Sequence, residues 1–418
     1  MNATTNKLTP KCNGEMEGNM RFMLEDSIMV KDKECTAGSS ILKGFKALIN
    51  SNVYEKCIAA GFEFIGQVKP DEFGIDRLFD DESAVSGFAV SEGAVSEVAL
   101  SETAASSSAA PSSTALASAA SSSAVSSSAA PSSAVAAVLD CRCDIVLCND
   151  VFGKIGRQAA ENGLIYIRPA YGSVSRYGLI PSVSSMDQIG VLCRDVQDGI
   201  KALTVISGYD ERDCTSLQFA SKSIDESANK SVDESAVILS GSASILKIDN
   251  PDEIRFFDIL APIFYILASA EIYGNTNRYN GATFGARSAD ARGVNDMFVN
   301  TRSEGFGRDL KIVALVGCMA LSKEHYEELY YKSMQIRGIV KRVYDELLSQ
   351  YDAIMLPTIL TRQSAETSKY QQLSLYALSA LCGYVSVSFR QGSERVQLIT
   401  VHGRESRILS YAANAAKT

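Results

Sequence analysis

Short apolar runs alternate along this chain with segments of helical periodicity, and this alternation restricts the folds that it can adopt. Four of the runs have the length and composition of strands: "SIMV", "FEFIGQV", "DIVLC" and "GLIYIRP", at 27–30, 62–68, 144–148 and 163–169. Strands that are separated by helical segments are typical of sheets that helices cover. The pattern therefore predicts an α/β fold with a large sheet.

Two amphipathic helices fit this prediction. Asp195 can cap the first helix, which is expected to stop at Gly208. Its apolar positions recur at helical spacing: Val196, Ile200, Leu203 and Ile206. The second helix has an apolar side of the same kind: Ile336, Val340, Val343 and Leu347. A further strand, "YDAIMLPT", is predicted to follow it.

One segment departs from this pattern. Residues 83–138 consist mainly of Ser, Ala and Val, and "SSSAAPSS" occurs twice, at 106–113 and 126–133. Because the segment has few large apolar side chains, it is expected to be a low-complexity insert without a packed core. It would separate an N-terminal part, 25–82, from the main part, 139–412, and residues 1–24 are expected to be flexible.

Composition points to a soluble cytoplasmic protein. The net charge is -9 and the pI is about 5.1, which argues against a nucleic-acid surface over the whole molecule. The ten cysteines lack the spacing of a small disulfide framework, so free thiols are expected. The longest apolar run, 259–270, is too short to span a bilayer and is expected to form a buried helix. The N-terminus lacks the apolar core of a signal peptide.

A tight turn follows the strand-like "DIVLC". The stretch "NDVFGKIGRQAA", 149–160, places Gly153 and Gly156 on either side of Lys154 and Ile155. Glycine permits the sharp bends that expose one side chain together with several backbone N–H groups. Loops of this build often hold a nucleophile, and here the exposed side chain would be Lys154. We call residues 149–154 the glycine turn.

Several ordered stretches carry motifs of one known family. Residues 174–216, "VSRYGLIPSVSSMDQIG…DERDCTS", are similar to S-R-F-G-L, S-S-L-D-Q-I-G and D-x-x-D-S-T-S in that order, and "RYNG" at 278–281 and most of 301–358 agree as well. Together they resemble the amidase signature family, and within it the A subunit of the glutamyl-tRNA(Gln) amidotransferase. The resemblance implies a single amidase-signature domain, a large mixed β-sheet flanked by helices on both faces.

The resemblance also implies a catalytic triad of Ser, cis-Ser and Lys. Lys31 falls on the position of the triad lysine, which the family uses as a neutral base. Asp150 and Gly153 match the family's oxyanion loop, but Lys154 stands where the nucleophilic serine belongs, and Phe152 replaces a glycine. If φ is positive at Phe152, its backbone would be strained.

The bridging serine of that triad is also missing. Counting back from the nucleophile position places it at Ala130, and Ser132 or Ser133 could replace it only if the chain is locally shorter. Cys141, Cys143 and Cys148 lie too far along the predicted strand to act as the nucleophile. Both halves of the serine relay are therefore expected to be lost or displaced.

Substrate and partners follow from the resemblance alone. Arg302 matches the arginine that holds the carboxylate of glutamine, and pairing with Glu304 or nearby backbone is the alternative. No metal site is expected, since His325 and His402 have no partner motif. The amidotransferase B and C subunits would complete a heterotrimer. The B subunit would bind most of the tRNA and would use ATP and Mg²⁺, with no cofactor on this chain.

Three functions remain open at this stage. The chain could be the A subunit of an amidotransferase and supply ammonia, with either Glu-tRNA(Gln) or Asp-tRNA(Asn) as the acceptor of the complex. It could be a non-catalytic scaffold or a decaying homologue, which the missing serines favour. It could also be a stand-alone amidase, which the motifs shared with the amidotransferase disfavour.

Overall fold

The computed structural model describes residues 19–76, 131–218, 243–250, 253–359 and 369–416. Nine strands form one sheet in the order β2-β1-β3-β5-β4-β8-β9-β7-β6. Their bounds are β1 Arg21–Glu25, β2 Glu63–Val68, β3 Ile145–Asn149, β4 Ile165–Arg168, β5 Ile189–Cys193, β6 Ile245–Lys247, β7 Ala353–Pro357, β8 Val385–Gln391 and β9 Glu394–Thr400. Parallel pairs (β1 with β2 and β3, β6 with β7) join antiparallel ones, so the sheet is mixed as expected.

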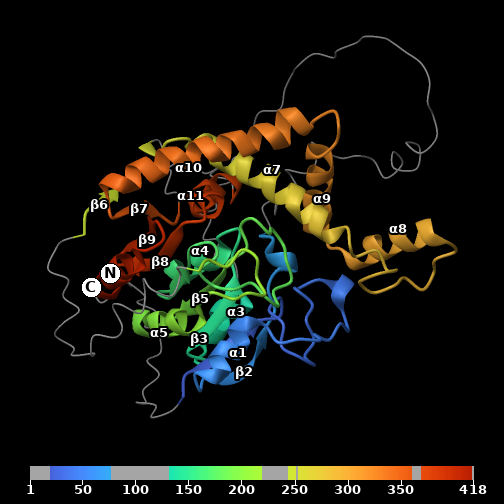
Figure 1. Ribbon diagram of the computed structural model, residues 1–418, viewed down its shortest axis with the longest axis horizontal. Coiled ribbons are helices and arrows are strands. Elements are labelled where there is room, and N and C mark those ends of the chain that lie inside the picture. The colour runs from blue at the N-terminus through green and yellow to red at the C-terminus, as the bar shows by residue number, and fades with distance from the viewer. Residues whose placement is uncertain (1–18, 77–130, 219–242, 251–252, 360–368, 417–418) are drawn as a thin grey trace, which may run out of the picture. The chain divides into compact units, whose positions relative to one another are not determined.

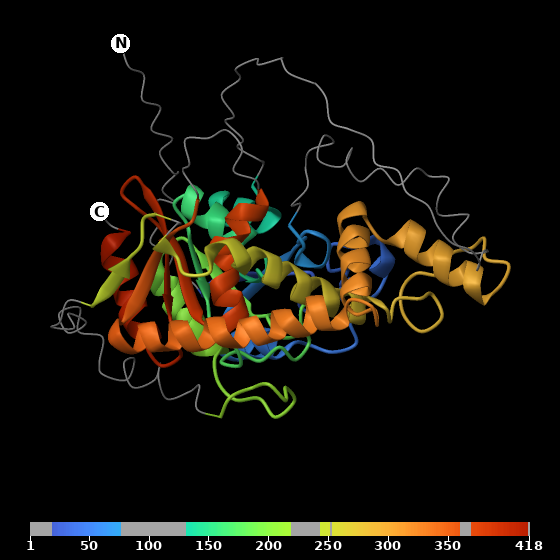
Figure 2. The same ribbon diagram turned by 90° about the horizontal axis from the view of Figure 1, so that it is seen from above.

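The helices connect and cover these strands (Figures 1 and 2). Their bounds are α1 Asn52–Ala59, α3 Ser133–Leu139, α4 Lys154–Glu161, α5 Val196–Ile206, α7 Phe257–Thr276, α8 Val294–Gly305, α9 Arg308–Ala320, α10 Lys332–Gln350, α11 Lys369–Cys382 and α12 Glu405–Ala415. Among the described residues, shorter turns of helix include η1 Ser40–Leu42, η2 Glu72–Gly74 and the π-helical η5 Tyr326–Tyr331. The long helix α10 runs beside α7, which also contacts α9 and α11.

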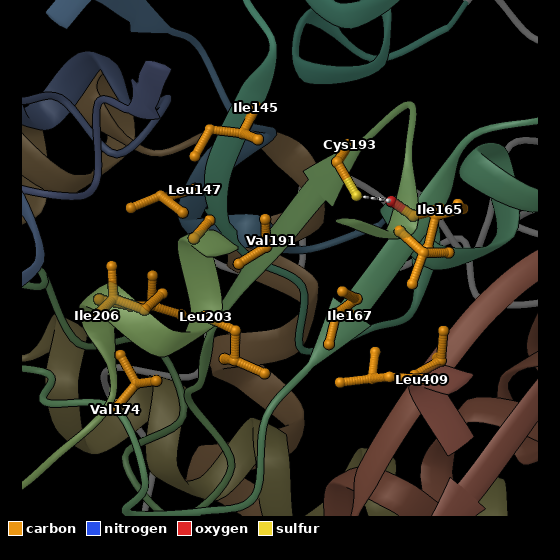
Figure 3. Close-up of a cluster of buried hydrophobic side chains, with 14 of the residues drawn as sticks. Ile145, Leu147, Ile165, Ile167, Val174, Val191, Cys193, Leu203, Ile206 and Leu409 are labelled. Atoms are coloured by element: carbon orange, nitrogen blue, oxygen red, sulfur yellow. Dashed lines mark hydrogen bonds between the residues drawn. The ribbon is translucent and has the colours of Figure 1, made fainter. Parts of the chain in front are cut away.

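Alternation along the strands divides the core between the two faces of the sheet. On β3, Ile145 and Leu147 point to the face that α1, α5 and α12 cover. Val146 and Cys148 point to the opposite face, under α3 and α4. Figure 3 shows Ile145, Leu147, Val191 and Leu203 of the first cluster. Helices therefore pack on both faces, which confirms the predicted fold class.

The predicted buried helix is α7. Among the described residues it is the one helix that is long and apolar enough to cross a membrane, and 61% of that apolar window is buried within the protein. A helix in the core of a globular protein can be equally long and apolar, so these two properties do not make α7 a membrane span. Its residue Ser269 lies so close to α9 that a Cβ on Gly317 would be 2.1 Å from the Ser269 carbonyl oxygen. The glycine thus permits the two helices to touch through their backbones.

Most predicted elements are confirmed, and three predictions need correction. "SIMV" is not a strand, because Ile28 makes only an isolated bridge with Leu179. β1 instead starts at Arg21, within the N-terminal segment that was expected to be flexible, and it is ordered because Phe22 and Leu24 are fully buried. The last residues of the Ser/Ala/Val-rich segment form α3, whose small apolar side chains pack on the sheet. Ala130 and the remainder of that segment lie outside the described residues.

Candidate functional site

The glycine turn lies between the end of β3 and the start of α4, as the sequence predicted. Gly153 is the N-cap of α4 and has φ 77°, a conformation that favours glycine. A Cβ at this position would lie 2.2 Å from Cγ of Tyr376, on α11. Both the backbone conformation and the close approach of Tyr376 therefore require glycine here.

Asp150 holds the turn to the first residues of α4. Its Oδ2 atom accepts a hydrogen bond from the Gly156 N–H over 2.7 Å. Burial raises the pKa of Asp150, while the hydrogen bonds from Gly156 and Ile155 act in the opposite direction. The carboxylate thus occupies N–H groups that could otherwise face an oxyanion.

Aromatic side chains cover the turn. The ring of Phe152 packs edge-on against Phe264 of α7, with centroids 5.2 Å apart and an interplanar angle of 86°. Phe152 is not among the residues with positive φ, so the predicted backbone strain is wrong. Tyr376 lies over Gly153 from the other side. At the one position where the resemblance expects a glycine and the chain has Phe152, a packed aromatic contact is found instead.

Lys154 stands at the expected nucleophile position but is engaged in ion pairs. Its Nζ atom lies 2.5 Å from Oδ2 of Asp71 and 4.0 Å from Oδ1 of Asp76. Arg157, one turn later on α4, bonds the other oxygen of Asp76 over 3.0 Å. Two cations of α4 therefore bind two carboxylates that flank η2. An ammonium group held by carboxylates has no free electron pair with which to attack an amide.

The structure does not bring Lys31 into this cluster. Lys31 is exposed in a turn, and its backbone N–H donates to Oδ1 of Asn50 over 2.8 Å. Within the described parts of the chain, no hydrogen bond or ion pair joins the Lys31 side chain to the glycine turn. Its assignment as the triad lysine came from the family resemblance of the segment around it. The strand that leads into the site, β1, ends at Glu25, six residues earlier.

Glu25 occupies the strand end beside the glycine turn, and the sequence reasoning missed it. Its Oε2 atom accepts a hydrogen bond from the Asn149 N–H over 2.8 Å. Burial raises the pKa of Glu25 to about 8, against the effect of that hydrogen bond. The sequence contains one signal for Glu25, the run "RFMLE" that ends with it. If this run forms a strand parallel to "DIVLC", both strands end at the same edge of the sheet, and Glu25 then lies beside the glycine turn.

Asn149 links the turn to the family-like segment around Asp187. Its Nδ2 atom donates to Oδ1 of Asp187 over 2.9 Å, and its Oδ1 accepts from the Gln188 N–H over 3.0 Å. Asp187 also accepts from the backbone N–H groups of Ser182 and Val183. Both side chains are buried and occupied by structural hydrogen bonds.

The two candidate bridging serines have structural partners. Ser132 caps α3 by accepting from the Val135 N–H, and its own N–H donates to Oε1 of Gln158 over 2.9 Å. The Ser133 hydroxyl donates to the Lys69 carbonyl oxygen. No hydrogen bond of the described residues connects either hydroxyl to Lys154. The expected position of the bridging serine, Ala130, is not among those residues.

Arg302 on α8 binds the loop before it. Its Nη2 atom donates to the carbonyl oxygen and to Oδ1 of Asn277, over 2.9 and 3.1 Å, and its Nε donates to the Tyr279 carbonyl over 3.4 Å. Glu304 instead accepts from the Ser288 hydroxyl over 2.8 Å. The guanidinium of Arg302 therefore stabilises the loop that contains "RYNG" through these hydrogen bonds. Its role toward a substrate carboxylate stays a prediction.

The space next to the glycine turn is very small. A cavity of about 10 Å³ touches the turn at Asp150, Val151 and Gly153, and this is at the lower limit of the space that one water molecule needs. A larger cavity of about 180 Å³ is lined by Arg176, Asp187, Arg212 and neighbouring residues, and Lys154 is not part of its lining. Within the described ranges there is no group of three or more His, Cys, Asp or Glu side chains suited to a metal ion.

The cysteines of the predicted strand play no visible part in the site. Burial raises the pKa of Cys143 to about 12 and holds that of Cys148 well above its usual value, so neither is an activated thiol. Eight cysteines of the described residues are free thiols.

Comparison of the sequence with protein families and with known proteins shows which family this chain belongs to. The amidase family model matches residues 88–245 and 246–397. The chain belongs to the amidase family. It is 31% identical over 360 residues to the A subunit of the glutamyl-tRNA(Gln) amidotransferase of Campylobacter jejuni, covering 81% of this chain and 72% of that protein. It is 29% identical over 359 residues to the corresponding protein of Lachnoclostridium phytofermentans, where it spans 66% of the relative's length.

Solved structures of amidase-family proteins share the fold. The crystal structure of the glutamyl-tRNA(Gln) amidotransferase A subunit from Thermotoga maritima matches with a TM-score of 0.59 and 20% identity, over 94% of this chain and 83% of that one. The peptide amidase of Stenotrophomonas maltophilia matches with a TM-score of 0.63 and 16% identity, over 96% and 82%. At these identities the likeness shows the fold alone.

Proposed function

We propose that this protein takes the place of the A subunit in a glutamine-dependent tRNA amidotransferase but does not itself release ammonia from glutamine. The observation that carries the proposal is the ion pair between Lys154 and Asp71, at the position where the family resemblance places a nucleophilic serine. The relationship to the glutamyl-tRNA(Gln) amidotransferase proteins of Campylobacter jejuni and Lachnoclostridium phytofermentans supports the place in the complex.

Three requirements of amide cleavage argue against activity. The reaction needs a nucleophile next to a base, N–H groups directed at the developing oxyanion, and room for the substrate. Lys154 is paired with carboxylates, and Glu25 rather than a lysine ends β1 beside the turn. Asp150 occupies N–H groups of α4, and the cavity at the turn has about 10 Å³. A glutamine side chain needs many times this volume.

A structural role in a complex would require the fold of the A subunit but not its catalytic serines. In such a complex the B and C subunits would be the partners, and the former would bind tRNA, ATP and Mg²⁺. Arg302 would then stabilise the "RYNG" loop without holding glutamine. The cytoplasm is the expected location, because the proposed partners act in translation.

The test is to co-express the chain with the B and C subunits of a glutamyl-tRNA(Gln) amidotransferase and to measure co-purification and ammonia release from glutamine. The complex with the Campylobacter jejuni relative in place of this chain is the positive control. A stable complex without ammonia release supports the proposal. Ammonia release from glutamine above background would contradict the inactive site, and failure to co-purify would contradict the scaffold role. Amide hydrolysis by the chain alone would favour a stand-alone amidase.

A further inference from the structure

Helix α9 is apolar around its whole circumference. Every residue of "IVALVGCMA", 312–320, is apolar, although an ordinary surface helix has one apolar and one polar face. One face of α9 is buried and packs on α7 (Figure 1). It consists of Leu310, Val313, Gly317 and Ala320. A helix that is apolar all round is normally covered on its other side as well.

The other face of α9 is open to solvent. Leu315 is 71% exposed and Met319 is 47% exposed. Ile312 and Val316 are partly exposed and lie next to them at helical spacing. We call these four residues the outer stripe. Single exposed apolar side chains are common on protein surfaces, but a continuous row of them is typical of an interaction surface.

The charges at the two ends of α9 indicate the kind of partner. Arg308 is exposed and precedes Ile312 by four residues, so it continues the outer stripe at the N-terminal end. Glu324 is exposed just after the C-terminal end, and the exposed Glu327 and Glu328 make this end acidic. The surface is thus basic at one end, apolar in the middle and acidic at the other end. Such a surface is complementary to a second copy of itself that runs in the opposite direction.

We propose that the outer stripe is a contact between two copies of this chain, whose α9 helices pack antiparallel about a two-fold axis near Val316. In such an isologous contact the same patch of both copies is used. Arg308 and Glu324 are each eight residues from Val316, so Arg308 of each copy lies opposite Glu324 of the other. Asp309 and Lys323 correspond in the same way. A parallel arrangement would instead place like charges together.

The oligomeric state of the purified full chain tests this contact. Because α9 is only about 20 Å long, the dimer should be weak and should depend on protein concentration in sedimentation velocity. Leu315→Glu places a charge in the middle of the outer stripe and should raise the dimer Kd about tenfold or more. Ile58→Glu, on α1 and 43% exposed in the parent, is the control and should leave the Kd unchanged. A parent that is monomeric at every concentration, or a Leu315→Glu variant that dimerises like the parent, overturns the proposal.

Exchange of the two end charges tests the antiparallel arrangement. Arg308→Glu and Glu324→Arg should each weaken the dimer, and the double variant should restore it, because both pairs then form again with reversed sign. A double variant that is as weak as the single variants overturns this arrangement.

The contact does not depend on the proposed function, since the purified chain is measured alone. The B subunit of the amidotransferase could cover the outer stripe instead of a second copy. If the parent is monomeric and Leu315→Glu abolishes co-purification with that subunit, the proposal is overturned and the stripe belongs to the complex.

Discussion

Glu25 and Asn149 meet at the ends of two parallel strands, where the Asn149 N–H donates to the Glu25 carboxyl over 2.8 Å. The contact places a buried carboxyl group at the edge of the sheet where the glycine turn begins. Asp150, Asp26 and Asp71 lie near enough to raise its pKa further. The chemistry of this site is therefore that of a buried acid, and a proton-accepting lysine is not found there among the described residues.

The stability of the protein should fall as pH rises toward 8, because of Glu25. Its pKa is about 8 when folded, against 4.5 for the ordinary group, so the folded state binds more protons between these values. In Glu25→Gln this pH dependence disappears. The variant should match the parent at about pH 5 and exceed it by on the order of a few kcal/mol at about pH 9.

Urea unfolding at both pH values measures the effect of this change. Glu211→Gln, in an exposed turn, is the control and should leave the pH dependence as in the parent. Equal pH dependence in the parent and Glu25→Gln would show that Glu25 is not the responsible group.

Gly153→Ala should be strongly destabilising. It forces a positive φ on alanine and places Cβ 2.2 Å from the ring of Tyr376, so a loss of about 3 kcal/mol or more in the free energy of unfolding is expected. Gly163→Ala is the matched control, because φ is 69° there but no atom lies within 4 Å of the new Cβ. It should cost only about 1 kcal/mol. Similar losses in the two variants would mean that Tyr376 does not pack on the turn.

Replacing Lys154 should weaken the fold without creating activity. Lys154→Ser restores the hydroxyl that the family uses, but no base is bonded to it, so ammonia release from glutamine should stay at background. Lys154→Met leaves Asp71 without its cation, and we expect a loss of about 1–2 kcal/mol by denaturant titration.

Lys247→Met provides the comparison for that loss. Its exposed pairs with Asp249 and Glu394 should contribute less than about 1 kcal/mol. Measurable glutaminase activity in Lys154→Ser would show that a functional base lies within reach of the turn.

The reactivity of the cysteines should follow their burial. Of the eight free cysteines in the described ranges, Cys214 and Cys318 are exposed, and the others are buried. We expect these two to react rapidly with a thiol reagent under native conditions, and Cys143 and Cys148 to react only after unfolding. Cys214→Ser should remove one rapid equivalent. Rapid labelling of Cys148, located by mass spectrometry, would mean that the sheet under α4 is open.

The local elements of this protein could be predicted from its sequence, since they depend on neighbours along the chain. Asp195 caps α5 because its side chain reaches the N–H of Gln197, two residues on. The apolar periodicity of α10 and the run that forms β3 are likewise properties of short windows. The glycine turn was also correctly located, because a bend between a strand and a helix needs Gly153 wherever the rest of the chain lies.

The composition of the site was decided by the tertiary structure. Glu25 and Asn149 are far apart in the chain, and they meet only because β1 and β3 pair in parallel with a particular register. A sequence window cannot show that register, so Glu25 was missed, while Lys31 was placed at the site by family resemblance alone. In the same way, Lys154 is paired with carboxylates on either side of η2, and Tyr376 packs on the glycine turn from α11. Packing against distant segments, and not local preference, determines which charges and rings enclose a turn.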